Sequence, residues 1–433
     1  VLASKNASLE EYYLMQKLAR GFGTENIDFR LDHANLSEGS SMDSSITLSE
    51  IESVDHALIL SSYSRLEQPM INHRIRKAVI NGATVNTINS KKFDFNFKTK
   101  IDLLTSPQAL LPALQSILKS LYLKTKADLP EQLSKVKLSD EYDKIADDLI
   151  ASENGVIVLG EHVNSNSSSS VIISTVSQIA RISNSKIANL SLSGNAHSAE
   201  KVGFIPTNHG MNAASMLTEN SKAFLLMDVD CEYDFVDAKL AMDLFNKDDV
   251  FVVSLTSFED KATLLSADVI LPMASFYETS GTHINFDGVA QSFSASVKSP
   301  GESKPGWKII KVMADLFELE GFNFVDSSQV AEEALLSSKV KTEVDISQAE
   351  HSENSNISTL WQYTPYAIDN VTRRAQALQE SNIGKINCAY LTKSTAERLS
   401  LSQDDLYLGV PVSISDDVAE DCVFVHTNQA RRA

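Results

Sequence analysis

The chain has 433 residues, 43% of them hydrophobic, so it can bury a full core and divide into about two to four domains. Its 38 Lys and Arg against 57 Asp and Glu give a net charge of −19, which argues against nucleic acid and anionic lipid as partners and favours proteins. No apolar run of about 18 residues or more occurs, so we expect no direct membrane insertion. Because the chain begins at Val1 without a secretory signal, we expect it to be part of a longer chain.

The first expected element is a helix close to the start of the chain. Ser8 and Glu11 have the spacing of a capping box, in which each side chain bonds to the backbone N–H of the other residue. Apolar residues then recur at helical spacing from Leu9 to Phe22, and Gly21 and Gly23 are typical of a helix end. The pattern predicts one amphipathic helix over this stretch.

A βαβ unit follows, with a strand at His56–Leu60, a helix from Pro69 to about Ile80 and a strand at Ala83–Ile88. The alternation of helices with near-continuous apolar strands goes on, which is typical of mostly parallel sheets covered by helices on both faces. Further strands are expected at 155–159, 187–192, 223–227, 250–255 and 268–271, and helices at 110–123 and 131–151. The sequence therefore predicts an α/β fold.

The last third of the chain changes in character. Residues 282–293 have the pattern of a hairpin, and residues 307–319 have the apolar stripe of a helix. Residues 326–358 are poor in large apolar groups and rich in Ser and Glu, which is typical of a linker. Short alternating strands then predict a small β-rich domain over 359–433.

The sequence offers no complete set of catalytic or ligating residues. Cys231, Cys388 and Cys422 are too few and too scattered for a four-thiolate cluster, and the histidines lack the close spacing of metal ligands. Glycine-rich phosphate loops and the GxSxG motif of hydrolases are also missing. We therefore predict no catalytic, cofactor-binding or metal-binding residue in this chain.

Three segments leave two interpretations open. Asn164–Ser170 is either a polar loop that ends at a helix N-cap or a phosphate site, and the lack of glycine favours the loop. The cations of Asn72–Lys77 form either a solvated helix face, which is favoured, or an anion site. Glu278–Asn285 follows a strand at its carboxyl end, where open α/β sheets bind ligands. That segment is either a loop held by Thr and Asn hydrogen bonds or a vestigial site.

Two blocks resemble the molybdopterin oxidoreductases, the family of formate dehydrogenases and nitrate reductases. Residues 13–28 are similar to the start of that family's catalytic fold, and residues 267–285 to its later signature. Within the family, the chain resembles the large iron–sulfur subunits of NADH-quinone oxidoreductase, respiratory complex I, in the bacterial form that corresponds to the mitochondrial 75 kDa subunit. The residues that carry this closer resemblance are Gln68–Lys77, Val289–Phe293, Pro300–Trp307 and Arg373–Leu378.

The chain departs from the active members of the family at the metal-ligating position. In formate dehydrogenases a cysteine or selenocysteine ligates molybdenum just after the motif that matches Asn26–Asp28, whereas Phe29–His33 contains no thiol. Val289 stands where the large iron–sulfur subunits of complex I commonly have an arginine. The resemblance therefore implies that a bound molybdopterin is not expected, and that iron–sulfur clusters are expected only in an N-terminal part outside this sequence.

The resemblance implies a molybdopterin-oxidoreductase-like fold with two interleaved, doubly wound domains, 1–35 with 187–325 and 36–186. It implies a cofactor-free structural region that supports NADH-to-quinone electron transfer without turnover of its own. Its partners would be other subunits of the peripheral arm of complex I, on the cytoplasmic side of the bacterial inner membrane. The alternatives are an active molybdopterin-dependent oxidoreductase similar to formate dehydrogenases, and a nucleotide-binding module at the carboxyl edge of the sheet that begins with the βαβ unit.

Overall fold

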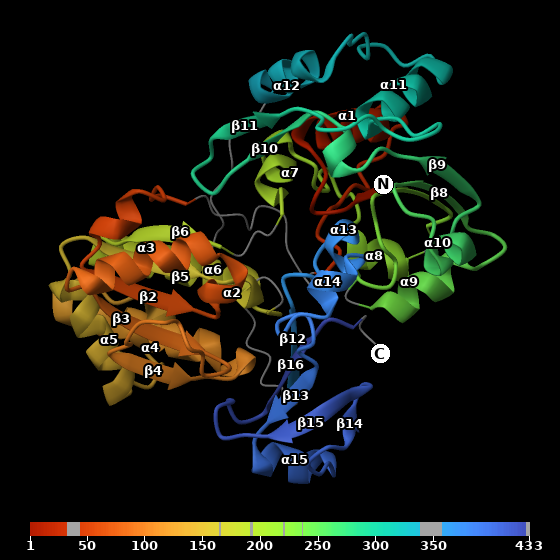
Figure 1. Ribbon diagram of the computed structural model, residues 1–433. Coiled ribbons are helices and arrows are strands. Elements are labelled where there is room, and N and C mark those ends of the chain that lie inside the picture. Colours follow the sequence, from red (N-terminus) through yellow and green to blue (C-terminus); the bar gives the residue numbers. More distant parts are fainter. Residues whose placement is uncertain are drawn as a thin grey trace.

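Three larger sheets and a two-stranded hairpin organise the chain (Figure 1). The computed structural model describes residues 1–32, 44–163, 166–190, 194–219, 221–235, 237–337 and 357–429. We call the sheets A, B and C in the order of their first strands. In Figure 1, the unit of sheet B lies beside the unit of sheet A, and sheet C lies below and between the two. Among the described residues, no helix combines the length and the apolar character of a membrane span.

Sheet A is entirely parallel, with the strand order β1-β7-β8-β9, so its first strand comes from the N-terminus and the others from the second half of the chain. Its strands are β1 (Leu2–Ala3), β7 (Ala223–Met227), β8 (Phe251–Thr256) and β9 (Val269–Pro272). The helices of this unit are α1 (Leu9–Gly21), α7 (Ala196–Val202), α8 (Ala213–Thr218), α9 (Ala238–Phe245), α10 (Lys261–Ser266) and α11 (Gly306–Leu316).

Alternation along the strands of sheet A explains its two covered faces. Leu225 and Met227 join the core that contains α1, α7 and α11, whereas Phe224 and Leu226 join the core that contains α8 and α9. The predicted hairpin is confirmed, because β10 (Gly281–Ile284) pairs antiparallel with β11 (Ala290–Phe293) beside α1. A short 3₁₀ helix, η4 (Phe276–Glu278), precedes this hairpin.

Helix α1 forms as its sequence predicts. The Ser8 hydroxyl accepts a hydrogen bond from Glu11 N at 3.3 Å, and Ser8 N donates to Glu11 Oε2 at 2.8 Å, so the capping box is confirmed. Tyr12, Leu14 and Leu18 are fully buried in the core of this unit. The helix therefore fixes the loop between β1 and its own N-terminus above the carboxyl edge of sheet A.

Sheet B is also entirely parallel, with the strand order β4-β3-β2-β5-β6. Successive strands are added on one side of β2 as far as β4 and then on its other side from β5, as in doubly wound folds. Its strands are β2 (His56–Leu60), β3 (Thr84–Asn89), β4 (Ile101–Leu104), β5 (Gly155–Leu159) and β6 (Lys186–Asn189). Its helices are α2 (Ser64–Glu67), α3 (Pro69–Ile80), α4 (Pro107–Thr125), α5 (Asp140–Ala151) and α6 (Ser169–Ser183), with 3₁₀ turns η1 (Glu50–Ser53), η2 (Glu131–Leu133) and η3 (Glu161–Val163).

Helices cover both faces of sheet B. Leu58 and Leu60 share a core with α4, α5 and α6, and Ala57 and Ile59 share a core with α3. Sheets A and B together confirm the predicted α/β fold with mostly parallel, doubly covered sheets.

Sheet C is mixed and belongs to the C-terminal part of the chain, which is rich in strands as predicted. Its order is β12-β16-β13-β15-β14, with parallel pairs β12–β16 and β13–β15. Its strands are β12 (Ser358–Tyr363), β13 (Cys388–Leu391), β14 (Leu406–Tyr407), β15 (Val410–Ile414) and β16 (Cys422–Thr427), and its helices are α13 (Asn370–Arg373), α14 (Gln376–Gln379) and α15 (Lys393–Leu399).

The helix predicted over 131–151 is wrong in its first third. Only a 3₁₀ turn occurs at 131–133, and α5 begins at Asp140. The Lys119 ammonium donates to the carbonyls of Ser134 and Val136, each at 2.7 Å, and these carbonyls are therefore not bonded in a helix ladder. The tertiary contact overrides the local helical preference.

The linker predicted over 326–358 is wrong at its start. Residues 327–336 form helix α12, which Asp326 caps by accepting from Gln329 N at 3.1 Å. Val330 and Ala334 are fully buried in the core that contains α1, and this packing stabilises a helix in a segment with few large apolar residues. Residues 338–356 of the predicted linker lie outside the described residues.

The boundary predicted between 186 and 187 also needs correction. Strand β6 pairs in parallel with β5, and its Ile187 completes the core of sheet B, so this strand does not belong with sheet A. Residues 191 and 192 of the strand predicted at 187–192 lie outside the described residues. The division into domains at 1–35 with 187–325, 36–186 and 359–433 stays a proposal, with β6 moved to the unit of sheet B.

Candidate functional site

The carboxyl edge of sheet A gathers polar residues from several loops. The loop Ser4–Ser8 follows β1, Asp228 follows β7 and Ser257 follows β8. Open α/β sheets bind ligands at this edge, because the loops after parallel strands meet there. Helix α13 from the C-terminal part contacts the same edge (Figure 1), so this is the candidate site.

Arg373 fastens the C-terminal part to the edge of sheet A. Its Nη1 lies 3.1 Å from Asp230 Oδ2, and its Nη2 lies 3.4 Å from Asp234 Oδ1. The guanidinium also lies over the ring of Tyr233, 4.4 Å from the ring centroid. The side chains of Arg373 and Asp230 are only 7% and 5% exposed, so breaking this ion pair from one side would leave a buried charge without its partner.

Two neighbours of Arg373 extend this contact. Asn370 Nδ2 donates to Asp228 Oδ1 at 3.1 Å, and Arg374 Nη2 lies 2.6 Å from Asp260 Oδ2. Arg374 is about one-third exposed and lies over the ring of Phe258, 4.3 Å from its centroid. We call these contacts the ionic latch. Its residues are Asn370, Arg373 and Arg374 on one side and Asp228, Asp230, Asp234 and Asp260 on the other.

Two carboxyl groups of the latch, those of Asp228 and Asp234, have raised pKa values. Burial raises the pKa of Asp228 to about 7, although Asn370 and Arg373 both favour its charged form. Burial likewise raises the pKa of Asp234 to about 6, despite the adjacent Arg373 guanidinium. A region that holds several carboxylates out of water therefore accepts protons readily and attracts cations.

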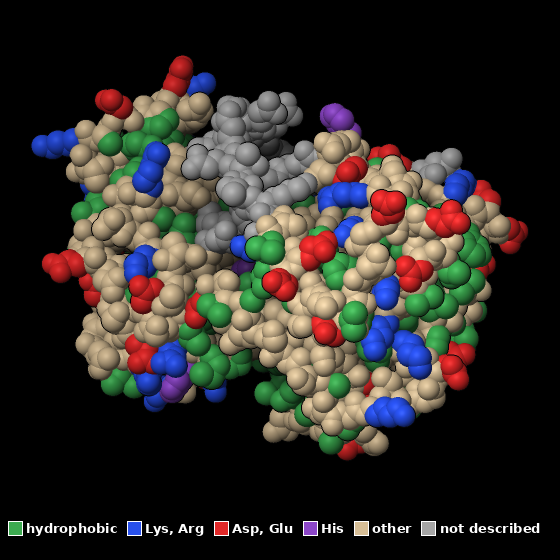
Figure 2. All heavy atoms as spheres, turned by 90° about the horizontal axis from the view of Figure 1, so that it is seen from above, with side chains coloured by type: hydrophobic (Ala, Val, Ile, Leu, Met, Phe, Trp, Pro, Cys, Tyr) green, Lys and Arg blue, Asp and Glu red, His purple; other side chains and the backbone are tan. Residues whose placement is uncertain are grey.

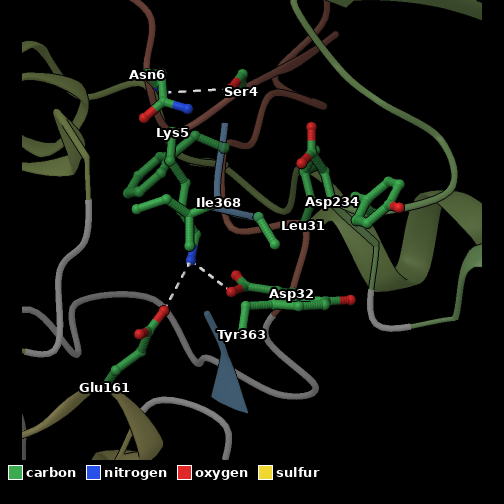
Figure 3. A pocket seen from close by; sticks show the side chains of 12 residues that line it. Ser4, Lys5, Asn6, Leu31, Asp32, Glu161, Asp234, Tyr363 and Ile368 are labelled. Carbon is green, nitrogen blue, oxygen red and sulfur yellow. Dashed lines mark hydrogen bonds and ion pairs between the residues drawn. The ribbon is translucent and has the colours of Figure 1, made fainter. Parts of the chain in front are cut away.

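A small cavity lies where the three units meet (Figure 3). Lys5, from the loop after β1, points between two carboxylates, with Nζ 2.5 Å from Asp32 Oδ2 and 3.8 Å from Glu161 Oε1. Glu161 follows β5 of sheet B, and Tyr363 ends β12 of sheet C. The cavity measures about 60 Å³, and the ion pair of Lys5 with Glu161 connects the units of sheets A and B beside it.

The lining of this edge does not fit a molybdopterin nucleotide. Such a cofactor carries phosphate groups, which bind to cations and to clusters of backbone N–H groups. Among the described residues that line the cavity of about 60 Å³, the one cation is Lys5, and it is already paired. A second pocket of about 240 Å³ at the same edge is lined by Glu11, Asp228 and Asp369, and its described lining contains no Lys or Arg. These carboxylates would repel the phosphates of the cofactor.

The cysteines do not fit a metal site either. Cys231 and Cys422 are buried, and burial raises the pKa of each thiol to about 12, so both stay protonated at neutral pH. Burial also raises the pKa of the half-buried Cys388. Within the described ranges, no three His, Cys, Asp or Glu side chains come together in a way that could hold a metal ion. We derive no catalytic step through a metal–pterin group.

The carboxyl edge of sheet B is acidic at the point where the strand order reverses. A Cβ at Gly160, after β5, would overlap the carbonyl oxygen of Ser61, after β2, so the two loops are in close contact. Burial and the charge of Glu161 raise the pKa of Glu67 in this crevice to about 7. Phosphate groups are disfavoured beside two carboxyl groups, and this arrangement gives no support to the nucleotide-binding alternative.

The cations of Asn72–Lys77 pair with acidic side chains and backbone. Arg74 and Lys77 both form ion pairs with Glu52, the latter at 2.9 Å. Asn72 is buried, and its Nδ2 donates to the Phe95 carbonyl at 3.0 Å. These contacts agree with the favoured interpretation, a helix face, and do not form an anion site.

The segment Glu278–Asn285 is held by hydrogen bonds, as the loop interpretation expects. Thr282 donates through its backbone N and its hydroxyl to the two carboxylate oxygens of Glu10, at 2.9 and 2.8 Å. Val289 N donates to Asn285 Oδ1 at 2.9 Å across the hairpin turn. Thr279 and His283 of this segment also line the pocket of about 240 Å³, so the interpretation as a vestigial site stays a prediction.

The serine-rich segment Asn164–Ser170 leads into α6, whose N-cap is Ser168, as the loop interpretation expects, and its last two serines form the start of the helix. The Ser168 side chain makes no capping hydrogen bond, and Asn166 Nδ2 donates to the Pro107 carbonyl at 2.7 Å. Residues 164 and 165 lie outside the described residues. The helix begins at Ser169, inside the run of serines, and the phosphate interpretation stays without support.

The sequence interpretation missed the ionic latch. Asp228, Asp230 and Asp234 follow an apolar strand at its carboxyl end, which is the one local signal of a site. Arg373 lies 143 residues after Asp230, so no local pattern could predict their contact. Only the family resemblance singles out Arg373.

Comparison with known proteins identifies the fold. The family model for molybdopterin oxidoreductases matches residues 1–316. Acetylene hydratase from Pelobacter acetylenicus superposes with a TM-score of 0.65 at 12% identity, covering 99% of this chain and 79% of the hydratase. At that identity the similarity concerns the fold alone.

The curated relatives are longer than this chain. The 78 kDa subunit of mitochondrial NADH-ubiquinone oxidoreductase from Neurospora crassa is 23% identical over 323 residues, which is 72% of this chain and 38% of that subunit. The alpha subunit of F420-dependent formate dehydrogenase 1 from Methanococcus maripaludis is 35% identical over 94 residues, 22% of this chain and 13% of that subunit. The chain thus spans well under half the length of these relatives.

Proposed function

The chain belongs to the molybdopterin oxidoreductase family, and from this premise we propose that it is a non-catalytic region of an iron–sulfur subunit of NADH-quinone oxidoreductase. In this proposal the region carries no cofactor of its own. It supports electron transfer from NADH to quinone by contacting and stabilising neighbouring parts of the assembly. The iron–sulfur clusters lie in a part of the subunit outside this sequence.

The observation that carries the proposal is the charge of the candidate site. A family fold that binds a phosphate-bearing cofactor would need cations at the carboxyl edge of sheet A, but the lining there is acidic. The arginines that reach this edge come from the C-terminal part and are bound to Asp230, Asp234 and Asp260. They hold the units together, and because they form ion pairs with these carboxylates they do not serve to bind a phosphate group.

We further propose that the partners are other subunits of the peripheral arm, and that the chain is placed peripherally on the cytoplasmic side of the bacterial inner membrane. Figure 2 views the side that carries α11 and α12, where apolar side chains and charges of both signs are interspersed. Exposed apolar residues near this side include Phe22, Val312, Leu316 and Phe317, at 46%, 56%, 77% and 60%. Such a mixed surface suits contact with another protein.

The proposal can be tested in the native cell. The full protein that contains this chain is tagged at its C-terminus, purified under mild conditions and analysed by mass spectrometry. We expect subunits of NADH-quinone oxidoreductase to co-purify in equal amounts, and NADH:quinone activity to travel with them. If the chain purifies without them, the proposal is wrong.

An active molybdopterin-dependent oxidoreductase is the second candidate, because the relative of 35% identity is a formate dehydrogenase subunit. The short length of that match, 94 residues, limits its support. Formate oxidation by the purified full protein with an artificial electron acceptor would favour this candidate. We expect no such activity.

A further inference from the structure

The pocket of about 240 Å³ at the carboxyl edge of sheet A has two kinds of wall. One wall is aromatic. It is made by Phe258, Phe276, Tyr277, His283 and Phe293. Burial lowers the pKa of His283, so this imidazole is neutral near pH 7 and adds no positive charge. The ring centroids of Phe276 and Phe293 lie 5.5 Å apart, and those of His283 and Phe293 5.1 Å apart, so the wall is continuous.

The other wall carries the carboxyl groups of Glu11, Asp228 and Asp369. They differ in how many hydrogen bonds their oxygens already accept. Glu11 accepts from Ser8 N at 2.8 Å in the capping box of α1. Asp369 Oδ1 accepts from the backbone N–H groups of Val371 and Thr372, at 2.9 and 2.8 Å, as the cap of α13. Both are therefore occupied by structural bonds.

Asp228 is the carboxylate that can accept further hydrogen bonds. Among the described residues, only the Asn370 side chain donates to it, and that bond goes to Oδ1 at 3.1 Å. Arg373, whose charge favours the ionised form of Asp228, donates its hydrogen bonds to Asp230, Asp234 and the Asp369 carbonyl oxygen. The Asp228 backbone has φ +52°, a left-handed conformation that Asp and Asn adopt more readily than most residues. The pocket thus pairs one under-satisfied carboxylate with an aromatic wall.

We propose that this pocket binds a small organic cation, an amidinium or ammonium group attached to a flat apolar body. The charged nitrogen would donate to Asp228, and the flat body would lie against the aromatic wall. A charge-assisted hydrogen bond is about twice as strong as a neutral one, and an aromatic face attracts a cation. Asp369 and the charged form of Asp228 disfavour anions in this pocket. This ligand class is separate from the phosphate-bearing cofactor of the family and does not depend on the proposed function.

Binding of the cation should be linked to proton release. The groups that face Asp228 include Glu11 and Tyr12 on α1, Asp234 after β7, and Asn370 and Arg373 on α13. Because burial raises the pKa of Asp228 to about 7, its carboxyl group is mostly protonated at pH 6 and mostly charged at pH 8. A cation binds to the charged form, so its affinity should rise by up to about tenfold over this range.

The test is isothermal titration of the full chain with three probes of the same shape. Benzamidine is the cation, benzamide its neutral counterpart and benzoate the anion. We expect saturable binding of benzamidine at one site, at least about tenfold weaker binding of benzamide, and no binding of benzoate. Equal affinity for benzamidine and benzamide, or binding of benzoate, would overturn the proposal.

Two variants locate the site. Asp228→Asn keeps the shape and the left-handed backbone and should weaken benzamidine at least about tenfold while leaving benzamide unchanged. Phe276→Ala, at a half-exposed position that should not affect folding, should weaken both probes. Asp315→Asn on the exposed side of α11 is the control and should change neither. Unchanged benzamidine affinity in both Asp228→Asn and Phe276→Ala would exclude this pocket.

Discussion

The C-terminal part covers the carboxyl edges of both parallel sheets, but with different chemistry. At sheet A it uses the ionic latch, in which buried arginine and carboxylates meet. At sheet B it uses an aromatic seam formed by Phe93, His162 and Phe424. The ring centroid of Phe424 lies 5.7 Å from that of Phe93 and 5.6 Å from that of His162. A backbone bridge between Lys91 and Val418 continues this seam.

The two contacts should respond differently to pH and salt. The contact between the apolar rings of Phe93 and Phe424 depends little on pH or salt, so it should hold sheet C to sheet B under most conditions. The latch depends on the charge of Asp228, Asp230 and Asp234, and burial raises the pKa of each of them. The contact of the C-terminal part with the edge of sheet A is therefore the one whose stability should change with pH.

Removing the centre of the seam should have the largest effect. Phe424 is 1% exposed and packs against two rings, so Phe424→Ala should lower the free energy of unfolding by about 3–5 kcal/mol. Urea unfolding followed by fluorescence measures this loss. Phe424→Leu keeps most of the volume and is the matched control, with a smaller expected loss. If the two variants lose the same stability, the seam is not held by ring packing.

Removing the centre of the latch should have the next largest effect. Arg373→Ala leaves Asp230 and Asp234 without their cation, and we expect a loss of about 3 kcal/mol at pH 8. The loss should shrink at pH 5, because the carboxyl groups can then take up protons. Hydrogen exchange of residues 369–374 should rise in the variant while the seam stays protected. A loss that does not depend on pH would contradict the latch.

Lowering the pH should stabilise the folded chain through Asp228. The pKa of Asp228 is raised to about 7 in the folded chain, above about 3.9 in the unfolded chain. Between these values the folded state binds more protons, so the free energy of unfolding falls as pH rises. From pH 6 to pH 8 Asp228 should account for a loss of about 1 kcal/mol. Asp228→Asn should remove that part of the pH dependence, whereas a wild-type slope in the variant would assign it to other groups.

The smallest effect is expected at the rim of the latch. Arg374 and Asp260 are about one-third exposed, so their ion pair at 2.6 Å is screened by solvent. Arg374→Ala should cost about 0.5 kcal/mol or less, and added salt should erase the difference. Thermal unfolding at low and high salt measures both. A cost as large as that of Arg373→Ala would mean that burial does not decide the strength of these pairs.

Local signals in the sequence predicted the parts of the fold that local interactions stabilise. The capping box of Ser8 and Glu11, and the apolar strands of sheets A and B, were predicted because each is stabilised by spacing or by apolar content within a few residues. The segment 134–139 and helix α12 were not, because contacts with Lys119 and with α1 decide their structure.

The candidate site was predicted less well than the fold. The sequence pointed to Glu278–Asn285, and two of its residues do line the larger pocket. The latch was beyond prediction because Arg373 and its carboxylates are far apart in sequence and meet only when sheet C packs on sheet A. The raised pKa values of Asp228 and Asp234 follow from that packing, and no local pattern encodes burial of this kind.

We propose that this member of the molybdopterin oxidoreductase family carries no metal–pterin group. The most direct measurement is elemental analysis of the full protein, purified from its native host grown with molybdate and tungstate, together with fluorescence of released pterin. The acidic edge of sheet A predicts molybdenum and tungsten far below one atom per chain and no pterin. Either metal in equal proportion to the chain, with pterin, would contradict the account.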